Sequence, residues 1–298
     1  MKSPRRSLAT PTKRAWRLRR RARLDPSDHA AEATKLVPGS VRVFFVGGLM
    51  SYRALFNWIN PWVMIPSFFV APLFQILLFA YIGRAAHLRS DEFYVIGNAL
   101  QYASIPCLFA MGNTIANERR QQTLGPVLAT PARRLPLFVG RAVPVMANGF
   151  FVAAFALAAG SALLGVHVPL GAVAPLALVV AVTSFSCTGL GLVTAAVGLR
   201  VIDTAVFGNI LFGLLLIFCG VNVPLDALPG WMSTTAQGLP LTHAIEAARR
   251  LADGASLASV GGLVAAEAAI GVAYVAVGYV LLRLVEFESR RLATLETA

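Results

Sequence analysis

The sequence offers few residues that could perform catalysis or hold a metal ion. Its three cysteines, Cys107, Cys187 and Cys219, lie in apolar stretches and lack the short spacing of metal-binding pairs. This placement is typical of buried free thiols, not of a disulfide framework or a metal centre. The chain has no His-x-x-Glu-His pair and no Gly-x-Ser-x-Gly elbow. We therefore expect neither a catalytic residue nor a metal or cofactor site in this chain.

A nucleotide-binding loop is missing from the sequence as well. A P-loop needs Gly-x-x-x-x-Gly-Lys followed by Ser or Thr, because the lysine reaches the terminal phosphates. The only lysines are Lys2, Lys13 and Lys35, and none of them follows a glycine. If the chain works with ATP, another polypeptide must bind the ATP and its Mg²⁺.

One polar stretch, NERRQQTLGPVLATPARRLPL at residues 117–137, lies between two long apolar runs. Asn117 can cap a short helix that has Glu118 in its first turn, and Gly125 with Pro126 would end this helix after about two turns. A connection between membrane helices needs only a few residues and some positive charge. A short polar helix held near the membrane suits a contact with a cytoplasmic protein, and a solvated basic loop that only sets the topology is the alternative.

The segments that must position these residues are predicted to be membrane-spanning helices. Of the 298 residues, 57% are hydrophobic and only 13% are charged, whereas the charged share of soluble domains is about 25%. A helix crosses a bilayer with about 20 apolar residues, and the runs here are about twice as long as the strands of a membrane barrel. We therefore expect an all-α integral membrane protein with six transmembrane helices, at 62–83, 93–116, 140–163, 172–199, 204–225 and 258–283.

The distribution of charge predicts the orientation of the chain. With a cytoplasmic N-terminus, 22 of the 26 Lys and Arg residues fall in segments on the cytoplasmic side, as the positive-inside rule requires. Both termini would then be cytoplasmic in a cell membrane. We expect three parts, namely a basic disordered tail at 1–39, a membrane domain at 40–286 and a short cytoplasmic tail at 287–298.

The basic tail raises the question of nucleic-acid binding. Its arginines could contact RNA or anionic lipid head groups. Retention of the N-terminus in the cytoplasm and contacts with membrane lipids explain them more simply, so we expect no nucleic-acid partner. After the tail, residues 40–60 place most of their large apolar side chains on one side of a helix that ends at Pro61. This pattern is typical of a helix in the membrane interface, or of an amphipathic helix packed on the bundle.

Two motifs resemble those of type 2 ABC exporter permeases, the ABC-2 membrane family, including its branch of drug-resistance and nodulation-factor exporters. The first family motif is close to Glu-Arg-x-x-Gly-Thr-Leu-Glu, followed by Thr-Pro and a basic residue, between the second and third spans. The matching residues are Glu118, Arg119, Thr123, Leu124, Thr130, Pro131 and Arg133. Gln122 and Gly125 depart from the pattern, where glycine and an acidic residue are usual.

The second motif lies in residues 219–251. The family carries Pro, then Leu-Pro-x-Trp, then Asn-Pro-Leu-Thr, and then Glu and Arg before the last span. The matching residues are Pro224, Leu228, Pro229, Trp231, Pro240, Leu241, Thr242, Glu246 and Arg249. Leu239 replaces the usual Asn. Residues 227–245 are uncharged but interrupted by Pro, Gly and Thr, which favours a re-entrant helical hairpin on the outer side over a seventh span.

The resemblance implies a permease subunit that is not itself an enzyme. Such permeases act in pairs, here expected to be a homodimer, with two copies of a cytoplasmic ABC ATPase. It also implies that 40–60 is the connecting helix and that the polar stretch holds the coupling helix. The residues expected to contact the ATPase, or to pack the coupling helix, are Glu118, Arg119, Arg120, Thr123 and Leu124.

Polar side chains within the predicted spans are candidates for a translocation path. The candidates are Asn98, Gln101, Asn113, Asn148 and Asn209, and Thr183, Ser184 and Ser186 share their setting. Hydrogen bonds between helices are the alternative role for each of them. Glu267, the one acid within the last span, has either a cargo or proton role or that of a hydrogen-bonded structural acid.

The scarcity of charge in the spans favours a hydrophobic or amphipathic cargo over a small ion. We therefore expect export of a drug, an antibiotic or another secondary metabolite, as in multidrug efflux and antibiotic resistance. A lipid-linked polysaccharide or lipo-oligosaccharide is the alternative cargo, and an ion-gradient transporter or a membrane scaffold is less favoured. The high content of Ala and Arg, with only three Lys, is typical of a GC-rich bacterial genome.

Overall fold

The computed structural model describes residue 62 and residues 65–120, 134–198 and 204–292. All regular elements within these ranges are helices, so the prediction of an all-α chain is confirmed for the described part. In chain order they are η1 (Pro66–Val70), α5 (Ala71–Ala85), α6 (Asp91–Tyr102), α7 (Ser104–Arg120), α9 (Arg134–Leu164), α10 (Leu170–Gly198), α11 (Thr204–Phe218), η2 (Leu225–Ala227), α12 (Gly230–Ala236), α13 (Thr242–Ala252) and α14 (Leu257–Leu292).

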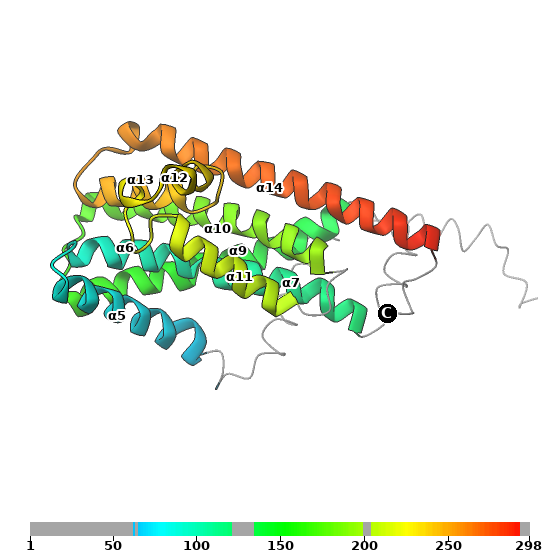
Figure 1. The fold of residues 1–298 in the computed structure, drawn as a ribbon, viewed down its shortest axis with the longest axis horizontal. Coiled ribbons are helices and arrows are strands. Elements are labelled where there is room, and N and C mark those ends of the chain that lie inside the picture. The colour runs from blue at the N-terminus through cyan, green and yellow to red at the C-terminus, as the bar shows by residue number, and fades with distance from the viewer. Residues whose placement is uncertain (1–61, 63–64, 121–133, 199–203, 293–298) are drawn as a thin grey trace, which may run out of the picture.

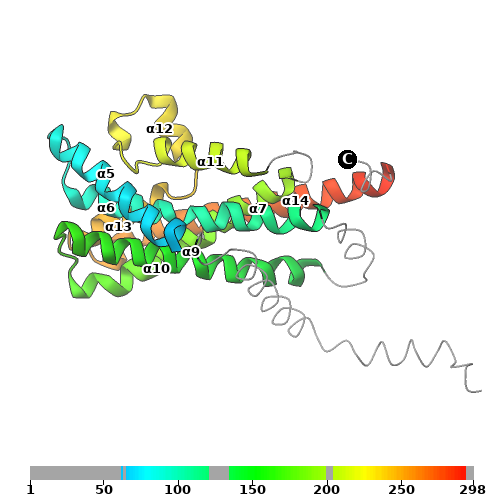
Figure 2. The same ribbon diagram turned by 90° about the horizontal axis from the view of Figure 1, so that it is seen from below.

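The long helices run along one common direction and give the bundle two distinct ends. Figure 1 shows α12 and α13 at one end, together with the turns that follow α5 and α9. We call this the hairpin end. The last turn of α7 and the C-terminal part of α14 lie at the opposite end. Figure 2 shows α11 and α12 on one side of the bundle, with α9 and α10 on the other.

Five of these helical stretches are long and apolar enough to cross a membrane. They are Pro66–Ala85, Asp91–Gly112, Ala142–Leu164, Leu170–Gly198 and Leu257–Val285. The apolar helix at Ala205–Phe218 is shorter. At 1.5 Å per residue, the 15 residues of α11 cover about 22 Å, less than the roughly 30 Å of a hydrocarbon core. The count of six spans therefore stays a prediction.

The end of α11 is set by a glycine in the left-handed conformation. Gly220 has φ 73°, a backbone conformation that is common just after a helix and that L side chains adopt at a cost. The sequence predicts that residues 219–225 complete this span. They instead form a turn that leads into η2, and this turn brings a polar side chain back against the bundle.

The second apolar run forms two helices instead of the one predicted at 93–116. Pro106 has no N–H for the carbonyl of Tyr102, and its ring crowds that carbonyl. Accordingly, α6 ends at Tyr102 and α7 begins at Ser104. The hydroxyl of Ser104 donates to the carbonyl of Gln101 at 2.6 Å, so this side chain is hydrogen-bonded where the helix is interrupted.

Helices α10 and α14 approach each other through small residues. A Cβ on Gly189 would lie only 2.8 Å from the carbonyl oxygen of Gly271, and a Cβ on Gly278 would lie 2.9 Å from Cγ of Leu192. Glycines at such positions let membrane helices pack closely, because no side chain separates the backbones. The two helices therefore form a tight pair along much of their length.

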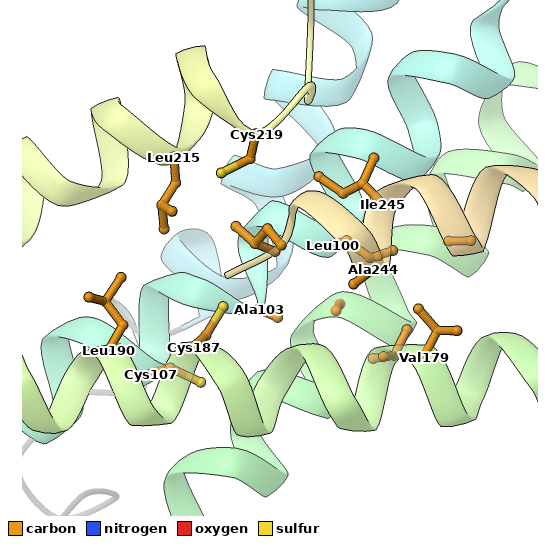
Figure 3. Close-up of a cluster of buried hydrophobic side chains, with 14 of the residues drawn as sticks. Leu100, Ala103, Cys107, Val179, Cys187, Leu190, Leu215, Cys219, Ala244 and Ile245 are labelled. Atoms are coloured by element: carbon orange, nitrogen blue, oxygen red, sulfur yellow. The ribbon is translucent and has the colours of Figure 1, made fainter. Parts of the chain in front are cut away.

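A buried apolar cluster joins the other helices to this pair. Leu100, Leu190 and Leu215 come together from α6, α10 and α11, and Ile245 of α13 closes the cluster at the hairpin end (Figure 3). The three cysteines point into the same cluster. All three are buried and free, which confirms the expectation of buried free thiols.

Candidate functional site

Four amide side chains form a polar cluster inside the bundle, which we call the amide cluster. They are Gln75 of α5, Asn98 and Gln101 of α6, and Asn222 of the turn after α11. The Nε2 group of Gln75 donates to Asn98 Oδ1 at 2.8 Å and to Gln101 Oε1 at 3.0 Å. Nδ2 of Asn98 donates to Asn222 Oδ1 at 2.8 Å and to the carbonyl of Tyr94 at 2.9 Å. The cluster ties the first two spans to the turn after α11.

The amide cluster is neutral, partly buried and only partly satisfied. The side chains of Asn98 and Gln101 are fully buried, and Gln101 also reaches the carbonyl of Phe212 in α11 at 3.3 Å. Nδ2 of Asn222 is buried without a hydrogen-bond partner among the described residues. An unpaired buried amide costs about 1–3 kcal/mol. Such a group favours any rearrangement that supplies an acceptor.

The five predicted path residues occupy different places. Asn98 and Gln101 meet in the amide cluster. Asn148 lies half-buried on α9, whereas Asn209 is exposed on α11. Asn113 belongs to α7, and its side chain lies outside what the structure describes. Their role in cargo passage stays a prediction.

The hydroxyl groups of α10 divide into two kinds. Thr183 and Ser184 donate to carbonyls of their own helix, those of Val179 and Val180, at 2.8 and 2.9 Å. These bonds satisfy the hydroxyls within α10 itself. The second kind also bonds to another helix. Oγ of Ser186 lies 3.0 Å from the carbonyl of Thr183 and hydrogen-bonds to Oε1 of Glu267 in α14. Oγ1 of Thr188 donates to Sγ of Cys107 in α7 at 3.3 Å.

Glu267 is fully buried (0% exposed) and accepts hydrogen bonds from the start of α13. Its Oε1 accepts the N–H of Leu241 at 2.8 Å, and its Oε2 accepts the N–H of Ala244 at 3.3 Å. Leu241 is the N-cap residue of α13 and has φ 83°, and α13 has no capping side chain of its own. A carboxylate here satisfies free N–H groups and lies at the positive end of the helix dipole. These are the contacts of a hydrogen-bonded structural acid.

Arg249 fastens α13 to α6 and to the turn after α11. Its Nη2 donates to the carbonyls of Phe93 and Val221 at 3.0 and 3.1 Å, and Cζ lies 3.5 Å from the centroid of the Phe93 ring. This distance is well within the range of a cation–π interaction. Burial lowers the pKa of Arg249 to about 10, so the guanidinium still carries its charge at neutral pH. A Cβ on Gly97 would lie 2.4 Å from the Val221 carbonyl, so only glycine leaves room for the contact.

The other residues of the second motif order the connection between α12 and α13. Pro229 is the N-cap residue of α12. Trp231 is 66% exposed and meets the ring of Phe218 edge-on, with centroids 5.8 Å apart. The hydroxyl of Thr242 donates to the carbonyl of Ala236 at 2.7 Å.

Two further motif residues complete this connection. Pro240 is buried, and Glu246 pairs with Arg250 at 2.8 Å. Helices α12 and α13 thus form a hairpin at one end of the bundle. Its insertion into a membrane stays a prediction.

The predicted coupling residues fall partly within the described chain. Glu118, Arg119 and Arg120 form the last turn of α7, at the end opposite the hairpin end (Figure 1). The expectation that Asn117 caps a separate helix is wrong, because α7 continues through it. No proline interrupts residues 107–120, so the helix has no strong reason to end earlier. Thr123 and Leu124 lie outside the described residues, as does the predicted helix at 40–60.

Sequence reasoning missed two members of the amide cluster, Gln75 and Asn222. The signal for Gln75 was present, since it is an amide inside a predicted span like Asn98. Asn222 carried the same signal, because it lies inside the predicted span at 204–225. Its partner could not be predicted, since the contact depends on the turn that replaces the end of that span. Within the described ranges, no group of three or more His, Cys, Asp or Glu side chains could hold a metal ion.

Comparison with known proteins places the chain in a family. No curated protein sequence matches it. A family model described as "ABC-2 type transporter" matches residues 48–251, more than half of the chain. The match includes the amide cluster and Arg249 and ends before α14. Together with the five membrane-length helices, this match shows that the chain is an integral membrane protein and belongs to the ABC-2 type transporter family, as its motifs predicted.

Proposed function

We propose that the chain is the membrane-spanning permease of an ATP-driven exporter for a hydrophobic or amphipathic compound, such as a drug, an antibiotic or another secondary metabolite. The family match over residues 48–251 carries this proposal. The sequence has no P-loop, so ATP and Mg²⁺ would bind to a separate ABC ATPase. We further propose two copies of each subunit, with the permease forming a homodimer.

The proposed topology has six spans, with α11 as the fifth and both termini in the cytoplasm. It puts the hairpin end outside the cell and the end of α7 inside. The charge pattern supports this orientation, because 22 of the 26 basic residues then fall on the cytoplasmic side. At the hairpin end the basic residues are largely paired with acids, as in Arg84 with Asp91 and Arg250 with Glu246.

The proposed input of energy is at the end of α7. Residues 118–124 would bind the ATPase as the coupling helix, and Glu118 to Arg120 are the last residues of α7. A displacement of this end would be carried along α7 to the break before Ser104, next to the amide cluster. The neutral amides inside the bundle suit a cargo that is polar in parts but carries little charge.

The coupling role is tested by reversing the charge of Arg119 and Arg120 to Glu. The tagged permease is purified in mild detergent from membranes of its source cells, and the ATP hydrolysis that co-purifies is measured. We expect the wild type to retain ATPase activity and the double variant to lose most of it, because the cationic contact is replaced by repulsion. The matched control reverses Arg89 and Arg250 at the hairpin end and should retain the activity. Equal ATPase activity in both double variants would overturn the assignment.

The cargo class is tested in inside-out membrane vesicles. ATP-stimulated accumulation of a hydrophobic fluorescent dye by the wild type, and not by the Arg119→Glu/Arg120→Glu variant, would support the proposal. Accumulation of a lipid-linked oligosaccharide without any dye transport would favour the alternative cargo. Transport that follows an ion gradient and ignores ATP would exclude the ABC mechanism.

A further inference from the structure

We propose that Glu267 is the positioning residue that fastens the start of α13 to α14 and α10, so that the hairpin end moves together with these two helices. Glu267 lies beyond the residues that the family model matches. The inference about fastening rests on geometry alone. Its consequence for transport rests on the proposed function.

Three groups converge on the one carboxyl of Glu267. Two are the backbone N–H groups of Leu241 and Ala244, which can only donate, and the third is the hydroxyl of Ser186. An ionised carboxylate only accepts hydrogen bonds, so it can satisfy all three. A glutamine would keep one acceptor oxygen and turn an NH₂ group toward a donor. The arrangement therefore requires a carboxyl and not merely a side chain of that size.

The backbone at the start of α13 needs an external partner. Leu241 has φ 83°, a conformation that is uncommon for a residue with a side chain and costs about 1–3 kcal/mol. No side chain of α13 caps its N-terminus. Glu267 compensates for both features, because it binds the N–H of Leu241 directly and the N–H of Ala244 in the first turn.

Further contacts fasten the same segment, residues 236–244. The thiol of Cys219 donates to the carbonyl of Pro240 at 3.3 Å, and the hydroxyl of Tyr274 donates to the carbonyl of Gly238 at 3.2 Å. Both contacts bind a carbonyl, whereas Glu267 alone binds the N–H groups of this segment among the side chains described. Tyr274 comes from α14, as Glu267 does.

The helices that hold Glu267 form a tight pair. Gly189 of α10 and Gly271 of α14 allow the two backbones to meet near this site, and Ser186 lies one turn from Gly189. The carboxyl group belongs to α14 and bonds to Ser186 of α10 and to the backbone at the start of α13. The start of α13 therefore cannot shift from α14, or together with α14 from α10, without breaking a hydrogen bond. The pair and the hairpin end are thereby joined into one unit.

The fastening is tested by hydrogen exchange on the full-length protein in lipid nanodiscs. Wild type is compared with Glu267→Gln, Glu267→Ala and Ser186→Ala. We expect the amides of Leu241 and Ala244 to exchange at least about 10-fold faster in both Glu267 variants, since a lost buried hydrogen bond changes local opening by that order. Ser186→Ala should have a smaller effect in the same direction.

The matched control is Ser184→Ala, which removes a buried hydroxyl of α10 whose one hydrogen bond among the described residues stays within its own helix. It should leave exchange at residues 236–244 unchanged. Exchange in the middle of α10 and α6 reports on the whole fold. Faster exchange limited to the start of α13 supports the proposal. Unchanged exchange in Glu267→Gln, or a rise shared equally by α6 and α10, would overturn it.

The consequence for transport is measured separately in the vesicle assay. Glu267→Gln should retain the co-purifying ATPase activity, because Glu267 lies near the hairpin end and the proposed ATPase contact is at the last turn of α7, at the opposite end. The variant should export several-fold more slowly. If the wild type exports nothing, the proposed function fails while the exchange result still decides the role of Glu267. Full export by Glu267→Gln despite fast local exchange would show that the hairpin end need not stay fastened to α10 and α14 during transport.

Discussion

Two polar sites inside the bundle hold the hairpin end of this protein, and they differ in the groups that form the hydrogen bonds. In the amide cluster, each of Gln75, Asn98 and Gln101 acts through neutral side-chain groups, and the partners are mostly other amides. At Glu267, one acidic side chain faces backbone N–H groups of α13. Both sites lie inside an apolar bundle, where an unsatisfied polar group is costly.

The difference in partners predicts a difference in behaviour. An amide carries both donors and an acceptor, so a cluster of amides can exchange partners with little loss. The unpaired Nδ2 of Asn222 already offers such an exchange. A carboxylate between backbone donors has no equivalent second arrangement. We therefore interpret the amide cluster as the adaptable site and Glu267 as the fixed one.

The largest effect is expected from Asn98→Asp, which makes the adaptable site resemble the fixed one. The change keeps the size of the side chain but replaces an NH₂ group that donates to Tyr94 and Asn222. An acceptor would then face two acceptors in a buried place, and the nearby guanidinium of Arg249 already donates to the carbonyls of Phe93 and Val221. We expect the free energy of unfolding in mixed detergent to fall by about 3 kcal/mol.

Asn222→Asp is the matched control for this prediction. The Nδ2 group of Asn222 has no partner among the described residues, so the same exchange of nitrogen for oxygen removes no donated hydrogen bond. Its effect should be clearly smaller than that of Asn98→Asp. Equal losses would mean that charge alone, and not the pattern of donors, sets the cost.

A smaller effect is expected from Arg249→Ala, which tests whether the two sites are independent. Arg249 binds the carbonyl of Val221, next to Asn222, whereas Glu267 binds the opposite end of α13. Loss of the cation–π contact and of two hydrogen bonds should lower the free energy of unfolding by about 2 kcal/mol.

Double-mutant cycles then measure the coupling. Arg249→Ala should couple to Asn98→Leu by more than about 0.5 kcal/mol and add to Glu267→Gln within that margin. Strong coupling of Arg249 to Glu267 would contradict the division into two sites and would make α13 a single rigid link between them.

The sequence could predict the helices because the signal for each helix, a long apolar run, lies within the helix itself. Long apolar runs require helices in a membrane, and five of the six predicted runs correspond to membrane-length stretches. Local signals also account for two details that the analysis of whole runs overlooked. Pro106 divides the second run, and Gly220 ends α11 early.

The pairings within the two sites could not be predicted, because they depend on tertiary contacts between residues that are far apart in the sequence. Asn98 meets a partner 124 positions away, and Ser186 meets one 81 positions away. Polarity inside a span marked Asn98 and Glu267 as unusual, but it does not say which partner each one meets. That information depends on the close approach of α10 and α14 and on the turn after α11.

The smallest effect is expected from Tyr274→Phe, which removes the second contact from α14 to the hairpin end. Its hydroxyl bonds the carbonyl of Gly238 at 3.2 Å, and hydrogen bonds of this kind in membrane proteins contribute about 0.6 kcal/mol on average. Tyr279→Phe is the control, because the Tyr279 hydroxyl accepts only from Arg283 of the same helix among the hydrogen bonds described. Unfolding in mixed detergent should show a loss for Tyr274→Phe that is several-fold smaller than for Glu267→Gln. A loss as large as that of Glu267→Gln would mean that many weak contacts share the fastening, and the comparison between a fixed and an adaptable site would no longer hold.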